Sequence, residues 1–200
     1  SGLQIYLLKH AKPEKFRNIK VSLHLPQYMS SLFTGHFFSD ITSIGCHTHL
    51  WDFNKQAYHG WVQAEDFLKL LPPIVPSDSI LEITLHGRKV KCGIGLHDSS
   101  AALIPYLKKF KEPFMLLSTG TWCISLNPFN RSPLTEDELS QDCLCYLGYQ
   151  GEPVKASRLF SGYEHEQQVK RLANHFNKTE DFFSNIVYNS AIESSVEFTS

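Results

Sequence analysis

The chain has 200 residues, of which 42% are hydrophobic and 20% are charged, a composition typical of globular proteins. Its formal net charge of −1 gives no electrostatic reason to expect nucleic acid or an anionic membrane surface as a partner. No apolar run approaches the roughly 20 residues that a membrane helix needs, and no signal peptide is visible at the start. The five cysteines are an odd number, which favours buried, reduced thiols in a cytoplasmic protein.

The amino-terminal part of the chain is predicted to be helical over residues 3–34, where apolar residues form short stripes. Gly35 is predicted to end the last of these helices as a left-handed cap. Residues 40–45 are small and polar and are predicted to form a loop. A short amphipathic helix is expected over residues 64–71.

The central part of the chain shows one pattern twice: an apolar run followed by Gly and small hydroxyl residues. In the first copy, residues 90–96 are predicted to form a buried strand that ends before Asp98. A helix is expected over residues 99–107, with Asp98 or Ser99 as its cap. A carboxylate after such a strand is compatible both with a simple helix cap and with a base that takes a proton.

In the second copy, residues 114–117 are predicted to form a strand and residues 122–126 its hairpin partner. Between them lies Ser118-Thr119-Gly120-Thr121, which is compatible with a tight turn. Its amides and hydroxyls are also suited to hold phosphate oxygens. Together with Asp98, this turn provides two parts of a phosphoryl-transfer site.

The rest of the chain offers a domain linker and further helices. Residues 108–113 form a charged, Pro-bounded run that is the best candidate for a linker, and we expect the site in the cleft between two domains. A polar loop is expected over 127–142, an extended segment over 144–149, and helices over 164–176 and 179–187.

The segment Cys46-His47-Thr48-His49 supports a competing hypothesis. Two imidazoles two residues apart on a strand point the same way and can share one metal ion, as in amidohydrolase-type barrels. Such a barrel needs about 250 residues and eight strand–helix units, which this chain does not supply. We therefore expect hydrogen-bonded histidines and no metal site, and a metal-dependent hydrolase that uses His47 and His49 remains the alternative.

Two motifs in the central part resemble the FGGY family of carbohydrate kinases, most of all its L-rhamnulokinase branch. Segments upstream of them fit the same family in the same order, so the resemblance spans about residues 3–175. The two motifs are Gly95-Leu96-His97-Asp98-Ser99-Ser100-Ala101-Ala102 and Leu117-Ser118-Thr119-Gly120-Thr121-Trp122.

The resemblance implies an α/β fold of the actin-like (ribonuclease H-like) sugar-kinase type, with two domains that close over ATP, Mg²⁺ and a sugar. Residues 1–110 would be the later part of the amino-terminal FGGY kinase domain, and residues 111–200 the first part of the carboxyl-terminal one. The family's Asp-x-Gly-Thr and Gly-Gly-Gly motifs are absent. We therefore expect a fragment that is inactive on its own.

The implied function is ATP-dependent phosphorylation of a hydroxyl group on a ketose such as L-rhamnulose or a related sugar. Sugar and ATP are the expected partners, without nucleic acid or membrane, and a homodimer is allowed. A non-catalytic binding protein of the actin-like superfamily is the second alternative. The motif match assigns Asp98 as the catalytic base, His97 and Ser99 as sugar contacts, and Gly120, Thr121 and Gln167 as contacts on the ATP side.

Overall fold

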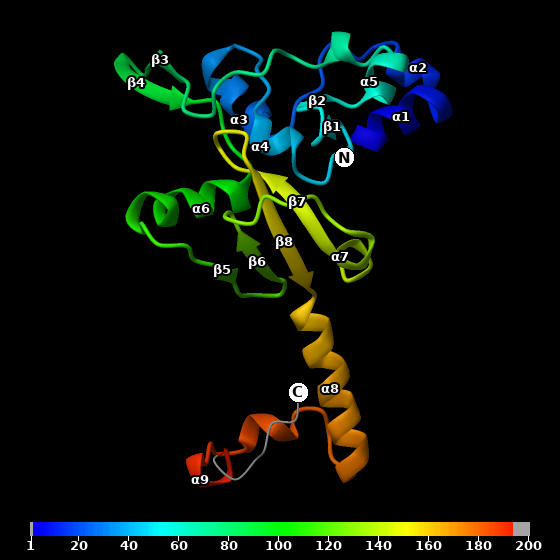
Figure 1. Cartoon of the computed structure of the whole chain (residues 1–200), viewed down its shortest axis with the longest axis vertical. Coiled ribbons are helices and arrows are strands. Elements are labelled where there is room, and N and C mark those ends of the chain that lie inside the picture. Colours follow the sequence, from blue (N-terminus) through cyan, green and yellow to red (C-terminus); the bar gives the residue numbers. More distant parts are fainter. Residues whose placement is uncertain (1, 194–200) are drawn as a thin grey trace. The chain divides into compact units, whose positions relative to one another are not determined.

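The computed structural model describes residues 2–193 and divides the chain into two compact units (Figure 1). The larger unit holds the residues up to Leu117 together with Ile124–Arg158. The smaller unit holds Ser118–Cys123 and the described residues from Leu159 onward. Residues 194–200 of the predicted second domain lie outside the described part. Within residues 2–193, no helix is long and apolar enough to cross a membrane.

Helices form the amino-terminal part of the larger unit, as predicted. Gly35 ends the third helix with a φ of 68°, which confirms the left-handed cap. The predicted loop over residues 40–45 is wrong, because Asp40 accepts hydrogen bonds from two backbone amides and so caps a fourth helix, α4 (Ile41–Ile44). The first three helices are α1 (Gly2–Ala11), α2 (Pro13–Phe16) and α3 (Leu25–Thr34).

The predicted helix over residues 64–71 is wrong. Asp66 has a φ of 57°, and this left-handed backbone separates two short helical elements. They are α5 (Gly60–Ala64) and the 3₁₀ helix η1 (Leu68–Leu70), and they follow the two-residue strands β1 (Trp51–Asp52) and β2 (Ala57–Tyr58). These elements still bury apolar side chains in one core cluster, made of Ile5, Ile44, Leu50, Val62, Phe67 and Leu70.

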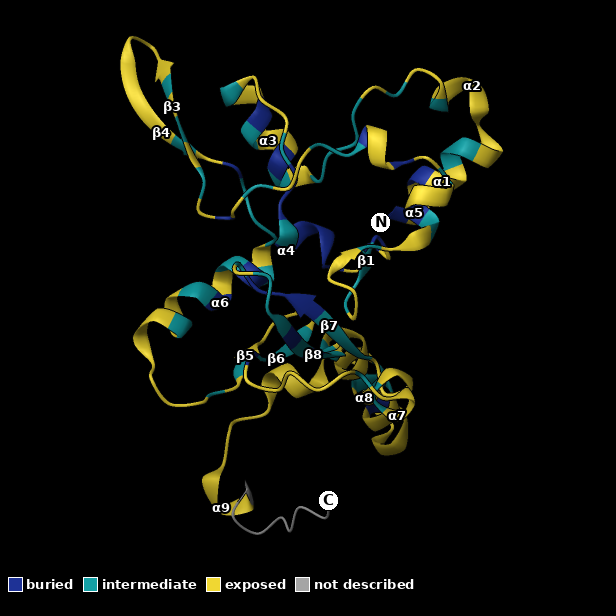
Figure 2. Cartoon of the chain, turned by 45° about the horizontal axis from the view of Figure 1, so that its top comes forward, coloured by how far each residue is buried: buried dark blue, intermediate teal, exposed yellow. Residues whose placement is uncertain are grey.

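The strand before Asp98 exists, but the prediction that it is buried is wrong. β3 (Ile80–Leu85) and β4 (Arg88–Gly93) form an antiparallel hairpin, with Ile80 paired to Gly93. Figure 2 shows that β4 is exposed along most of its length. Because β4 pairs only with β3 within the described residues, and three of its six residues are basic, it remains at the surface.

A four-stranded sheet, all but a few terminal residues of which belong to the larger unit, has the strand order β5-β6-β8-β7. The predicted hairpin is confirmed in that β5 and β6 are neighbours, although each strand begins one or two residues later than predicted. The sequence analysis missed β8, where basic and small residues interrupt the apolar run. The strands are β5 (Leu116–Ser118), β6 (Cys123–Asn127), β7 (Cys143–Leu147) and β8 (Pro153–Leu159).

Two helices accompany this sheet. The helix predicted over residues 99–107 is confirmed as α6 (Asp98–Lys109), which lies beside the sheet in Figure 1. Its Leu103 is buried against residues of three strands: Leu126, Tyr146, Val154 and Ala156. The predicted polar loop over 127–142 also contains a short helix, α7 (Glu136–Ser140), which begins with a capping box.

The smaller unit consists of the loop Ser118–Cys123 and three helical elements. The predicted helix over 164–176 is confirmed as α8 (Ser161–Phe176), with a start three residues earlier. The predicted helix over 179–187 is wrong except for the 3₁₀ helix η2 (Phe182–Asn185), which α9 (Ser190–Glu193) follows. Apolar residues of α8 and η2, among them Leu172, Phe176 and Phe183, line a cavity of about 300 Å³.

All five cysteines lie in the described part of the chain, and none forms a disulfide. The prediction that the thiols are buried is correct for Cys46 alone, because the other four cysteines are half-buried.

Candidate functional site

The turn that leads from β4 to Asp98 depends on close contact with α3. Gly95 has a φ of 86°, and a Cβ atom there would lie 2.6 Å from the carbonyl oxygen of Pro26. The Gln27 Nε2 atom donates a hydrogen bond of 2.7 Å to the Gly95 carbonyl oxygen. Only glycine combines this backbone conformation with so close an approach. The contact with α3 therefore fixes the path of the chain just before His97.

The backbone and side chain of His97 are both held by residues far away in the sequence. Its backbone N–H donates to Thr42 Oγ1 at 2.9 Å. Its ring Nε2 lies 3.0 Å from Cys46 Sγ and 3.1 Å from Asp98 Oδ1, and its ring meets Tyr146 edge to face. Because the carboxylate of Asp98 only accepts, we assign the proton of the neutral ring to Nε2.

Burial determines the charge states around His97. It lowers the pKa of the His97 imidazole, against the opposing effect of the carboxylates of Asp98 and Asp40. It also raises the pKa of the Cys46 thiol to about 12. At neutral pH the pair is therefore a neutral imidazole beside a protonated thiol, and Cys46 acts as a packing and hydrogen-bonding partner. The described residues offer no hydrogen-bond partner for the buried Nδ1 of His97.

Asp98 presents an exposed carboxylate on a fixed backbone. It is the first residue of α6, and its side chain is 91% exposed. The backbone N–H of Ser99 donates to Asp98 Oδ1 at 2.6 Å, and the Ser99 hydroxyl lies 3.3 Å from the same oxygen. The predicted capping role is wrong, because His97 is the N-cap and no side chain caps this helix. The carboxylate is thus exposed to solvent while Ser99 and His97 hold its Oδ1 atom, and the helix N-terminus favours its negative charge.

The predicted phosphate loop lies in the smaller unit, at the N-terminus of α8. Gly120 and Thr121 are both exposed. The Ser161 hydroxyl donates to the Gly120 carbonyl oxygen at 2.7 Å, and the Gly162 N–H donates to the Thr121 carbonyl oxygen at 3.0 Å. The loop is therefore attached by its carbonyl groups to the first turn of a 16-residue helix, an end that favours anions.

The last predicted residue, Gln167, is half-buried and lies two turns further along α8. The structure thus brings His97, Asp98 and Ser99 together in the larger unit, and it places Gly120, Thr121 and Gln167 in the smaller one. The pairing of the base with the phosphate loop remains a prediction.

The strand geometry assumed for the His-x-His alternative is wrong. His47 and His49 have φ values of 51° and 59°, and they precede β1 rather than lying within a strand. The ring Nε2 of His47 makes a hydrogen bond of 2.7 Å with the Tyr146 hydroxyl, while the carbonyl oxygen of His49 accepts from Trp61 Nε1. Among residues 2–193, no group of three or more His, Cys, Asp and Glu side chains could hold a metal ion.

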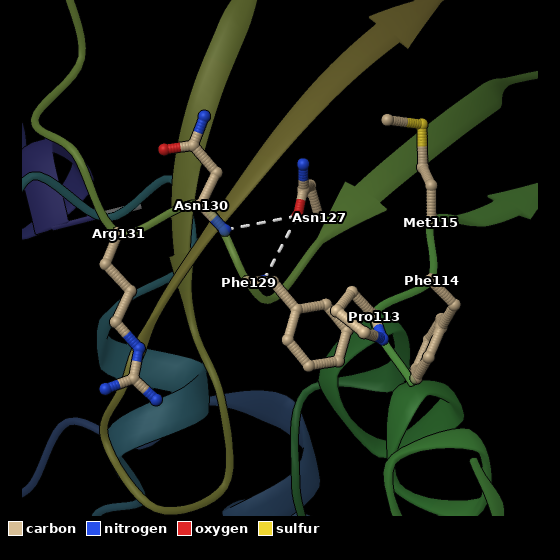
Figure 3. A pocket seen from close by; sticks show the side chains of 7 residues that line it. All are labelled: Pro113, Phe114, Met115, Asn127, Phe129, Asn130 and Arg131. Atoms are coloured by element: carbon tan, nitrogen blue, oxygen red, sulfur yellow. Dashed lines mark hydrogen bonds between the residues drawn. The ribbon is translucent and has the colours of Figure 1, made fainter. Parts of the chain in front are cut away.

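An open pocket of about 530 Å³ lies beside β5 and β6, apart from these residues (Figure 3). In Figure 3 the amide groups of Asn127 and Asn130 point to one side, whereas the guanidinium group of Arg131 points to the other. The Oδ1 atoms of both asparagines accept hydrogen bonds from their own loop. Because its polar groups point in different directions, we assign no ligand to this pocket.

The sequence analysis missed the residues that support His97, namely Asp40, Thr42 and Cys46. Thr42 and Cys46 lie 55 and 51 residues before His97, so no local pattern could connect them. One local signal was present: Asp40 directly before Ile41-Thr42-Ser43 is a helix N-cap pattern, and it could have revealed α4. The partners of the phosphate loop, Ser161 and Gly162, were missed for the same reason of distance.

Comparisons with known proteins agree with this fold. Residues 111–194 match the family model "Carbohydrate kinase FGGY, C-terminal domain". A solved carbohydrate kinase from Novosphingobium aromaticivorans is similar to 84% of this chain and 39% of its own, with 29% identity and a TM-score of 0.71. No curated protein matches the chain.

Two further solved structures, both from Lactobacillus acidophilus, share the fold at 15% identity and a TM-score of 0.65. A xylulose kinase matches over 92% of this chain and 38% of its own. A gluconate kinase matches over 84% of this chain and 35% of its own. The chain therefore spans less than two fifths of each of these three structures.

The fold and the comparisons together indicate the class of protein: the chain is an α/β fragment similar to part of a sugar kinase. The family match covers residues 111–194 alone, so the chain is similar to the carboxyl-terminal domain of FGGY carbohydrate kinases there, and it spans only part of each similar structure. The comparisons do not distinguish the L-rhamnulokinase branch from the others.

Proposed function

We propose that this chain is the middle part of a carbohydrate kinase that phosphorylates a hydroxyl group of a small sugar with ATP. The observation that supports this most strongly is the carboxylate of Asp98. It is exposed, whereas the backbone that bears it is held by α3, by Thr42 and by the first turn of α6. An accessible carboxylate on a fixed backbone is what a general base for a hydroxyl group requires.

In the proposed reaction, Asp98 accepts the proton of the sugar hydroxyl group. The oxygen of that hydroxyl group forms a bond to the γ-phosphorus of ATP. The bond between that phosphorus and the β–γ bridging oxygen breaks, and ADP leaves. His97 and Ser99 flank the carboxylate, and we propose that they contact other hydroxyl groups of the sugar. Their role is alignment, because phosphoryl transfer needs little covalent chemistry from the protein.

On the ATP side, we propose that Gly120 and Thr121 contact the phosphates and that Gln167 contributes to nucleotide binding. The exposed loop at the N-terminus of α8 supports this assignment. Mg²⁺ would accompany ATP and neutralise phosphate charge. The described residues form no cluster that would hold such an ion by themselves, so we assign it no protein ligand and derive no step from it.

We also propose the domain division predicted from the sequence, with 1–110 in the first domain and 111–200 in the second. Ketoses such as L-rhamnulose remain our candidate substrates, and the five unpaired cysteines agree with a cytoplasmic enzyme. The names of the similar structures add xylulose and gluconate to the compounds to be tested.

The test is ATP consumption by the full-length protein, measured over a panel of ketoses and sugar acids. We expect at least one sugar to raise ADP release more than tenfold above the rate without sugar. If a folded protein that binds ATP shows no sugar-dependent ADP release with the whole panel, the kinase proposal is wrong. A non-catalytic member of the superfamily would then be the better account.

A further inference from the structure

A buried carboxylate lies beneath the turn that bears Asp98. Asp40 is 0% exposed, and its two oxygens accept from four donors. Oδ1 accepts from the backbone N–H groups of Thr42 and Ser43 and from the Thr42 hydroxyl, while Oδ2 accepts from the Ser77 hydroxyl. A buried carboxylate must be satisfied in this way to be tolerated. Asp40 therefore fixes α4 and the segment of Ser77 relative to each other.

The hydroxyl group of Thr42 connects this buried carboxylate to the turn. Thr42 is 0% exposed, and its hydroxyl has a single hydrogen, which it donates to Asp40. Toward any other group the hydroxyl oxygen can then only accept, and it accepts a hydrogen bond from the backbone N–H of His97 at 2.9 Å. The carboxylate thus determines the direction of the hydroxyl, and the hydroxyl determines the position of the His97 amide.

The His97 amide belongs to the N-cap of α6, and Asp98 is the next residue. A shift of the N-cap would therefore move the catalytic carboxylate itself. The other contacts hold neighbouring groups. Gln27 binds the carbonyl of Gly95, and the Ser100 hydroxyl donates to the Leu147 carbonyl oxygen at 2.9 Å. Within the described residues, Thr42 is the side chain that bonds to the N-cap backbone.

We propose that Thr42, oriented by Asp40, is a positioning residue that fixes the start of α6 and so aims the carboxylate of Asp98 at the sugar hydroxyl. This proposal rests on the proposed kinase function for its effect on rate. Its structural part, the bond from the His97 amide to the Thr42 hydroxyl, stands independently. It predicts that the hydroxyl matters and that the rest of the threonine side chain does not.

The test compares Thr42→Val, which keeps the shape and removes the hydroxyl, with Thr42→Ser, which keeps the hydroxyl. Both are made in the full-length protein. Hydrogen exchange at residues 96–100, followed by mass spectrometry, reports on the bond without any assay of activity. We expect Thr42→Val to accelerate exchange there about tenfold, as expected for the loss of one buried hydrogen bond. It should lower kcat about tenfold, because a misplaced catalytic group is costly in rate, and change the KM for ATP less than twofold.

Thr42→Ser should stay within about twofold of the wild type in exchange and in kcat, and Thr84→Val, on the exposed β3, serves as the matched control. Unchanged exchange at 96–100 in a folded Thr42→Val protein would overturn the proposal. So would a Thr42→Ser protein whose exchange is accelerated, even if Thr42→Val fails to fold. Altered exchange in a protein that phosphorylates no sugar would support the positioning bond and contradict the kinase function alone.

Discussion

The two regions that we assign to the site differ in how the chain holds them. The turn at Asp98 is held from several sides: Gln27, Thr42 and Cys46 all bond to its residues from distant parts of the larger unit. The loop at Thr121 is exposed, and its hydrogen bonds run to the first turn of one helix, α8. The backbone that bears the base is thus held by buried contacts, although the carboxylate itself is exposed, whereas the phosphate loop lies at the surface as a whole.

This difference agrees with the different demands of the two tasks. A base must meet one proton at one distance, so small displacements cost rate. A phosphate group offers several equivalent oxygens and strong charge-assisted hydrogen bonds, so a loop that adjusts to it still binds well. Mutations in the turn at Asp98 should therefore lower stability, whereas mutations in the loop at Thr121 should lower the affinity for ATP.

The largest effect on stability is expected from Gly95→Ala. Alanine would adopt a φ of 86° at a cost of about 1–2 kcal/mol, and its Cβ would meet the Pro26 carbonyl oxygen at 2.6 Å. Overpacking adds about 1–3 kcal/mol, so the free energy of unfolding should fall by about 3 kcal/mol in urea denaturation. Activity should fall with it, because the Asp98 turn begins there.

Gly87→Ala is the matched control for this prediction. Gly87 has a similar φ of 75° at the tip of the β3–β4 hairpin, but a Cβ there meets nothing within 4 Å. Gly87→Ala should lower the free energy of unfolding by the cost of the backbone conformation alone, about 1–2 kcal/mol, and leave kcat unchanged. Equal effects of the two substitutions would mean that the contact between Gly95 and α3 does not hold the turn.

Thr121→Ala should change affinity without changing stability. Its side chain is exposed, so the free energy of unfolding should change by less than about 0.5 kcal/mol. Loss of a hydrogen bond to a charged phosphate costs about 1.5–3 kcal/mol, which predicts a KM for ATP raised roughly 10- to 100-fold. The KM for the sugar should stay within twofold. Steady-state kinetics with both substrates varied would refute the assignment if the sugar KM changed instead.

Acid should destabilise the larger unit, which contains three histidines with lowered pKa values. Burial lowers the pKa of His24, His47 and His97 below the ordinary value of 6.5. Between the lowered pKa values and 6.5, the unfolded chain binds more protons than the folded one, so stability rises with pH there. The free energy of unfolding should therefore fall as the pH is lowered from 7.5 to 5.5, as measured by denaturation at each pH.

A matched pair of variants isolates one of these histidines. His47 and His86 have left-handed backbones, with φ values of 51° and 49°, which asparagine tolerates. His47→Asn should make the pH dependence shallower, because it removes a ring whose pKa partial desolvation lowers in the fold. His86→Asn, at the exposed hairpin tip, should change it less. The same slope in the two variants would show that the lowered pKa of His47 does not contribute to the pH dependence.

The sequence predicted the elements whose signals are local. The motif around Asp98 and the helix after it were recognisable because turn, acid and apolar spacing are adjacent in the chain. The supports of that motif were not, because Thr42 and Cys46 reach His97 only through tertiary packing. For the same reason the left-handed backbone at His47 could not be foreseen, and a strand was assumed instead. The pairing of Asp98 with Thr121 remains a prediction.

The measurement that tests the central claim most directly is the rate of phosphoryl transfer in full-length Asp98→Asn protein, with Asp137→Asn as control. Asp137 is also an acidic residue in the first turn of a helix, α7, and is exposed. Loss of a general base predicts a kcat reduced 10²- to 10⁴-fold for Asp98→Asn, with the sugar KM nearly unchanged and stability altered by no more than about 1 kcal/mol. Asp137→Asn should match the wild type. An Asp98→Asn protein that phosphorylates sugar at nearly the wild-type rate would contradict the account.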